Sequence, residues 1–100
     1  MIKHIVMWKL KDFAENKSKN ENMQIMKNML ESLTDKIAEI EKMEVGFNIN
    51  PSEMAYDLVL YSEFKDEEAL EIYQKHPEHL KVKEFVAKVR EKRVVVDYKA

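Results

Sequence analysis

The residues best suited to chemistry in this sequence are three histidines, His4, His76 and His79, together with Tyr73. Imidazole is the side chain that titrates closest to neutral pH, so it can take up and return a proton under ordinary conditions. A phenol beside an imidazole can donate a hydrogen bond to an oxyanion as it develops. These residue types predict general base chemistry at a carbon next to a carbonyl group.

Spacing suggests how the histidines are placed. His79 lies three residues before Val82, on an apolar stripe that continues through Val86 and Val89, so His79 is expected to point inward. Tyr73 precedes His76 by three residues, close to one helical turn. We therefore expect a small pocket with His79 and Tyr73 as candidate catalytic residues. The residues predicted to line it with them are His4, Val6, Trp8 and His76.

Plainer interpretations stay open for these residues. A histidine on an apolar stripe is commonly a structural residue with its hydrogen bonds satisfied. His76 stands directly before Pro77, where it could cap a helix or face solvent. His76 and His79 form a His-x-x-His pair, but no carboxylate completes a zinc-protease pattern, so no metal site is predicted.

Composition excludes several function classes. The 100 residues contain one glycine, Gly46, which rules out the glycine-rich phosphate loops of nucleotide-binding proteins, and no cofactor is predicted. Cysteine is absent, so disulfides and thiolate chemistry are excluded. A net charge of −2 gives no electrostatic case for binding nucleic acid. A cluster of charged residues near the C-terminus is interpreted as a solvated face: Lys81, Lys83, Glu84, Lys88, Arg90, Glu91, Lys92 and Arg93.

No stretch approaches the roughly 20 apolar residues that a membrane span requires, and the amino terminus does not resemble a signal peptide. The sequence therefore predicts no membrane association and a cytoplasmic location. The length suits one domain, residues 1–100, and no composition shift marks an internal boundary.

The elements that must position the pocket follow from hydrophobic periodicity. Alternating or β-branched runs predict strands at residues 2–11, 43–50, 56–64 and 93–98. Three- and four-residue spacing predicts a long helix over residues 20–42, led in by a polar surface loop from Asp12 to Asn22. Ser18 and Glu21 could form a capping box at its start, with Asn20 as a competing cap. A shorter helix opens at Asp66, and a further one at Pro77.

This order is that of an α+β protein with the ferredoxin-like βαββαβ arrangement, a four-stranded antiparallel sheet with helices on one face. The strands are apolar on both faces, however. Residues such as Ile5, Met7, Val59, Tyr61 and Val95, or those of opposite phase, would lie on the face that no helix covers. A second copy of the chain is the economical cover, so the pattern predicts a homodimer through the sheet face.

Three segments resemble the stress-responsive dimeric α+β barrel family: Lys3 to Asp12, Tyr73 to His79 with its His-Pro-x-His motif, and Val94 to Tyr98. The resemblance spans nearly the whole chain and implies the same fold and a sheet-to-sheet dimer. The family includes a plant polyketide cyclase that makes olivetolic acid. The resemblance to it implies that His79 is the general base of an aldol-type ring closure, that Tyr73 assists at the carbonyl oxygen, and that His4 lines the pocket.

Several functions fit these observations. The first is a small-molecule-binding, stress-responsive dimer that takes an apolar or carbonyl-containing ligand. The alternative is a cofactor-independent cyclase-like enzyme using His79 and Tyr73. A purely structural subunit of a larger assembly is a third interpretation. A cofactor-free monooxygenase is more distant, because the asparagine, tryptophan and histidine set of those barrels has no clear match here.

Overall fold

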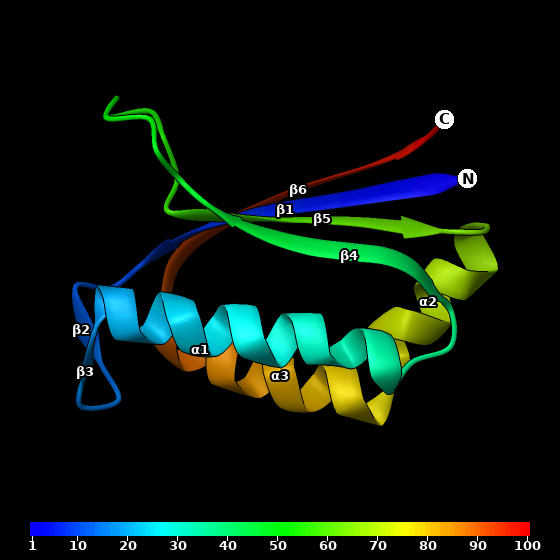
Figure 1. Ribbon diagram of the computed structural model, residues 1–100, viewed down its shortest axis with the longest axis horizontal. Coiled ribbons are helices and arrows are strands. Elements are labelled where there is room, and N and C mark those ends of the chain that lie inside the picture. Colours follow the sequence, from blue (N-terminus) through cyan, green and yellow to red (C-terminus); the bar gives the residue numbers. More distant parts are fainter.

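The computed structural model, which describes residues 1–100, is built on one four-stranded antiparallel sheet (Figure 1). Alternate residues of the first strand, from Ile2 to Leu10, are buried, as the period of a strand with one core-facing side requires. The strands stand in the order β4-β5-β1-β6. Their bounds are β1 Ile2–Leu10, β4 Ile40–Phe47, β5 Leu58–Phe64 and β6 Arg90–Lys99.

The helices all lie against one face of this sheet, with α1 and α3 side by side below it in Figure 1. They are α1 (Lys19–Ser32), the short 3-10 turn η1 (Leu33–Asp35), α2 (Glu67–Lys75) and α3 (Pro77–Val89). The core is a cluster of 19 buried apolar residues. This arrangement confirms the predicted ferredoxin-like fold with its helices on one side.

Local signals placed the helix starts correctly. The Ser18 hydroxyl accepts from the backbone N–H of Glu21, and the Glu21 carboxylate accepts from the N–H of Ser18, which completes the capping box. The Asp66 carboxylate caps α2 by accepting from the Ala69 N–H. Pro77 occupies the first turn of α3, as predicted.

The predicted end of the first long helix was wrong. Instead of reaching residue 42, α1 ends at Ser32, and the N–H groups of Lys36 and Ile37 both bond to the Leu33 carbonyl in a tightened turn. Ile37 and Ile40 are buried as their helical spacing suggested, but Ile40 is buried as the first residue of β4, paired with Phe64. Sheet pairing here overrides a periodicity that continues past the helix.

The predicted surface loop at residues 12–22 also contains an unexpected hairpin, β2 (Phe13–Ala14) paired with β3 (Lys17–Ser18). Its turn residues Glu15 and Asn16 have φ values of 52° and 61°, in the left-handed region that non-glycine residues seldom occupy. No glycine marked the turn, so turn chemistry alone did not reveal it.

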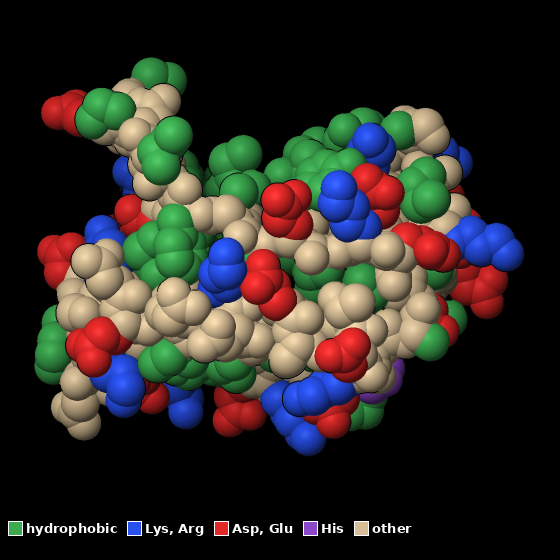
Figure 2. Space-filling model, viewed as in Figure 1, with side chains coloured by type: hydrophobic (Ala, Val, Ile, Leu, Met, Phe, Trp, Pro, Cys, Tyr) green, Lys and Arg blue, Asp and Glu red, His purple; other side chains and the backbone are tan.

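The other face of the sheet carries no helix, and apolar side chains stand along it at the upper side of the view in Figure 2. Register places Val94 and Val96 there, because the intervening Val95 pairs with the helix-facing Val6. The expected placement of Val95 on the open face is therefore corrected, and its neighbours take that position. The exposed apolar residues of this face include Met7, Val94, Val96 and Tyr98, each more than 40% exposed. No helix is long and apolar enough to cross a membrane.

Candidate functional site

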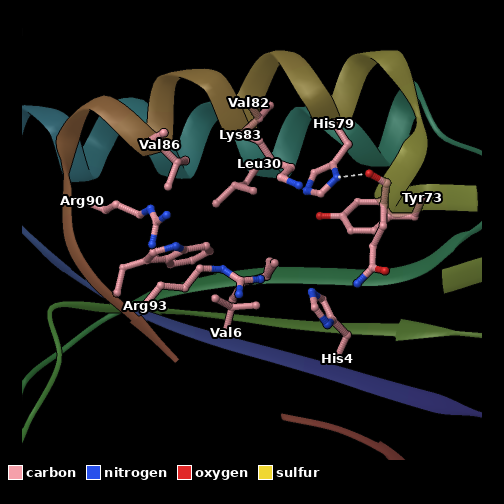
Figure 3. A pocket seen from close by; sticks show the side chains of 14 residues that line it. His4, Val6, Leu30, Tyr73, His79, Val82, Lys83, Val86, Arg90 and Arg93 are labelled. Atoms are coloured by element: carbon pink, nitrogen blue, oxygen red, sulfur yellow. Dashed lines mark hydrogen bonds between the residues drawn. The ribbon is translucent and has the colours of Figure 1, made fainter. Parts of the chain in front are cut away.

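A cavity of about 420 Å³ opens between the helix-facing side of the sheet and helices α1 and α3 (Figure 3). Its volume lies within the range typical of small-molecule sites. Fourteen residues line it, eight of them hydrophobic. Of the residues predicted from the sequence, the lining includes His4, Val6, Trp8, Tyr73 and His79.

The junction between α2 and α3 brings Tyr73 and His79 together. Tyr73 lies in the last turn of α2, and His79 in the first turn of α3. His76, between the two helices, has the extended conformation that a residue before proline favours. The chain therefore turns sharply at His76, and the rings of Tyr73 and His79 stack with centroids 4.2 Å apart.

His76 does not line the cavity, which corrects its predicted placement. Its Nδ1 accepts a hydrogen bond of 3.1 Å from the backbone N–H of Glu78, and its own N–H bonds to the Tyr73 carbonyl. It caps the end of one helix and the start of the next, so the plainer interpretation of His76 holds. Its contribution to the site is to fix the angle at which Tyr73 meets His79.

The tautomer of His79 is set by α2. Its Nδ1 lies 3.3 Å from the Gln74 carbonyl oxygen, one of the carbonyls at the helix end that lacks a partner within the helix (dashed in Figure 3). With the Nδ1 proton donated to that carbonyl, Nε2 is left as a hydrogen-bond acceptor. Partial burial is the main cause that lowers the pKa of His79 to about 4; the hydrogen bond to the Gln74 carbonyl opposes this shift, and the positive charge of Lys83 adds to it. The imidazole is therefore neutral at pH 7.

Tyr73 presents an unusual hydroxyl. Its side chain is fully buried, and the hydroxyl has no hydrogen-bond partner within the protein. In Figure 3 the oxygen points into the cavity beside His79. Burial raises the pKa of the phenol well above its usual value, so the group stays protonated and is available as a donor. A second buried donor without a partner, the indole N–H of Trp8, belongs to the same lining.

His4 occupies the sheet side of the cavity. It is buried on β1, and its Nδ1 is hydrogen-bonded to the carboxylate of Asp97 on the neighbouring strand β6. Its ring meets Tyr73 edge-on, with centroids 6.2 Å apart. The sequence had suggested that His4 and His79 meet in one cavity, and both do line it, with Tyr73 between them (Figure 3).

Sequence reasoning missed the basic part of the lining. Lys83, Arg90 and Arg93 were interpreted as part of a solvated face, and they are exposed, but all three also line the cavity. Lys83 lies four residues after His79, which was a usable signal, since that spacing places both on one side of a helix. Arg93 lies opposite Trp8 in the register between β1 and β6, a pairing that spacing along the chain does not reveal.

The family model described as the stress responsive A/B barrel domain matches residues 2–100. A crystal structure from Bacteroides fragilis, described as a dimeric protein of unknown function with a ferredoxin-like fold, is 39% identical, with a TM-score of 0.88. The match covers 99% of this chain and 95% of that one. No curated protein sequence matches the chain.

Two further neighbours are similar in fold alone. A hydroxynitrile lyase from Passiflora edulis is 20% identical with a TM-score of 0.79, covering 97% of this chain and 90% of that one. A putative antibiotic biosynthesis monooxygenase from Nitrosomonas europaea is 18% identical with a TM-score of 0.76, covering 100% and 98%. At these identities the likeness carries no assignment of activity.

The depressed pKa of His79 predicts a pH-dependent stability. Between pH 6.5 and about 4 the unfolded chain binds a proton at this histidine that the folded chain does not, so the free energy of unfolding should fall as pH falls through that window. Allowing for partial exposure, the loss should be on the order of 1 kcal/mol. Denaturation of the native protein and of His79→Gln at pH 7 and pH 4 measures the difference. An imidazole NMR titration with its midpoint near 6.5 would contradict this account.

Proposed function

Because the chain belongs to the stress responsive A/B barrel domain family, we propose that it uses the cavity of this fold to bind a small carbonyl-containing molecule. The observation that carries the proposal is the buried Tyr73 hydroxyl, which has no partner within the protein and faces the cavity. A buried donor left unpaired costs about 1–3 kcal/mol. A ligand carbonyl oxygen in the cavity would accept from it and remove that cost. The largely apolar lining suits the hydrocarbon part of such a ligand.

A second function, proton transfer, is favoured by the state of His79. Its Nε2 is unprotonated at pH 7 and stands beside the Tyr73 ring, so it can take a proton from the carbon next to a bound carbonyl. The electron pair of the broken C–H bond stays on the substrate, which becomes an enolate. The enolate oxygen accepts a hydrogen bond from the Tyr73 hydroxyl. The enolate can then attack a second carbonyl of the same molecule, and the resulting alkoxide takes the proton back from His79.

The low pKa of His79 restricts the substrate of this reaction. A base whose conjugate acid is strong abstracts protons effectively only from comparatively acidic carbons. A carbon flanked by two carbonyl groups meets this requirement, whereas that of a simple ketone does not. The proposed substrates are therefore 1,3-dicarbonyl compounds, the type of molecule on which an aldol-type ring closure acts.

Nonane-2,4-dione tests the proton transfer. In D2O the protein should speed deuterium exchange at the carbon between the two carbonyls, measured by NMR against buffer alone. His79→Ala should reduce that acceleration by about 10²-fold. His76→Asn is the matched control, since it removes a histidine outside the cavity and asparagine can still cap α3. Equal acceleration by the native protein and His79→Ala would exclude His79 as the base.

We also propose that the open sheet face packs against a second copy of the chain. Its exposed apolar side chains lie together on β1 and β6. On the same side of the sheet, the segment between β4 and β5 rises away from the molecule (Figure 1). That segment carries Ile49 and Met54, which are 97% and 88% exposed. Covering all of these with an identical face gives a two-fold dimer.

Two substitutions in β6 separate this interface from general effects of charge. Val96→Asp places a carboxylate on the open face and should shift the protein to a monomer at micromolar concentration, measured by sedimentation. Val95→Asp, the control, introduces the same charge one residue away on the helix-facing side, where Val95 is 48% exposed. It should leave the assembly unchanged. A native protein that sediments as a monomer would rule out the dimer.

A further inference from the structure

Three basic side chains surround the cavity without an acidic counterpart. Lys83 projects from α3, and Arg90 and Arg93 project from the first residues of β6 (Figure 3). No aspartate or glutamate belongs to the lining. This local excess of positive charge stands in a chain whose net charge is −2. The imbalance is therefore a property of the cavity and not of the surface as a whole.

These cations are also free of partners. Neither arginine nor Lys83 makes a side-chain hydrogen bond or an ion pair, whereas Lys75 and Lys81, on the neighbouring helical surface, pair with Glu71 and Glu78. Guanidinium groups present a planar set of donors that fits the oxygens of a carboxylate or a phosphate. The two arginines are therefore available to a ligand.

The positions of the lining side chains along the cavity indicate the order of the chemical groups in that ligand. In Figure 3, Tyr73 and His79 stand at one end of the cavity and Arg90 at the other, with Arg93 extending between them. Apolar side chains, including Val6, Leu30 and Val86, line the stretch between. A ligand that contacts every part of the cavity has a carbonyl at one end, a hydrocarbon spacer in the middle, and an anionic oxygen group at the other end.

We propose that the cavity selects an oxo acid, a carbonyl compound whose hydrocarbon chain ends in a carboxylate or a phosphate held by Arg90 and Arg93. This inference rests on the proposed carbonyl-binding function. It adds that the ligand is anionic and that its anionic end lies at Arg90 and Arg93. Lys83 ends beside His79 in Figure 3, toward the other end of the cavity, and adds to the positive field that draws an anion into it.

Anion binding would also act on the proposed base. Positive charge on Lys83 and Arg93 helps to lower the pKa of His79, as does the nearby His4, while the Gln74 carbonyl opposes them. An anion held by Arg90 and Arg93 offsets part of the positive field of Arg93, so the pKa of His79 should be higher with an anionic ligand than with a neutral one of the same shape. Substrate charge would thereby strengthen the base that acts on it.

Three probes of one shape test the proposal: 7-oxooctanoate, 6-oxoheptyl phosphate and the neutral methyl 7-oxooctanoate. Trp8 is the single tryptophan and lines the cavity, so its fluorescence reports binding directly. At low ionic strength at least one anionic probe should bind about tenfold more tightly than the ester, and added salt should reduce the difference. Which anion binds more tightly distinguishes a carboxylate ligand from a phosphate one.

Variants assign the preference to the arginines. The double substitution Arg90→Gln with Arg93→Gln should bring the anionic probes to within about threefold of the ester, while affinity for the ester itself stays unchanged and shows that the cavity is intact. Lys92→Gln is the matched control, because Lys92 is next to Arg93 on β6 but pairs with Lys9 on the opposite face. It should keep the preference.

The outcomes separate this inference from the function on which it rests. If the ester binds and neither anion binds more tightly, the oxo-acid assignment is overturned and carbonyl binding stands. The assignment is likewise overturned if the double variant keeps the full preference. If none of the three probes binds, the carbonyl-binding function fails, and the oxo-acid assignment fails with it.

Discussion

The proposed carbonyl site depends on one polar atom, the hydroxyl oxygen of Tyr73, which is buried without a partner in the protein. Nearly every buried polar group in a folded chain is hydrogen-bonded, since leaving one unpaired costs free energy comparable to a lost hydrogen bond. Phenylalanine would fill the same volume next to Phe64 without that cost. A tyrosine that points its oxygen into a cavity therefore indicates a group that meets it there.

The rest of the site follows from how the chain turns at His76. The Pro77 ring fixes the first turn of α3, and His76 caps the ends of both helices, so the last turn of α2 and the first turn of α3 meet at a fixed angle. That angle stacks Tyr73 on His79 and lets His79 bond to the Gln74 carbonyl. The same backbone contacts that end one helix and begin the next thereby select the tautomer of the proposed base.

Much of the fold and of the site could be predicted from the sequence, because these features depend on residues close together in the chain. Alternation along residues 2–11 identified the strand, although not which face is inward, and Ser18, Asp66 and Pro77 identified the helix starts. The stripe of α3 pointed His79 inward, and the structure places it in the cavity lining. These predictions depend only on spacing within a single element.

What the sequence did not reveal depends on contacts between elements. The pairing of Asp97 with His4, and of Arg93 with Trp8, follows from the register of β1 and β6, which are more than 80 residues apart along the chain. Register likewise decides that Val96, and not Val95, lies on the open face. The early end of α1 arises because Ile40 pairs with Phe64 in the sheet. Local periodicity carries no information on such pairings.

The most direct measurement compares Tyr73→Phe with the native protein for both folding and binding. If the hydroxyl serves a ligand, its removal should leave the free energy of unfolding unchanged or raise it by up to about 1 kcal/mol, while weakening the binding of methyl 7-oxooctanoate about tenfold. A variant that is clearly less stable and binds the ester as well as the native protein would show that the hydroxyl supports the fold and would contradict the account.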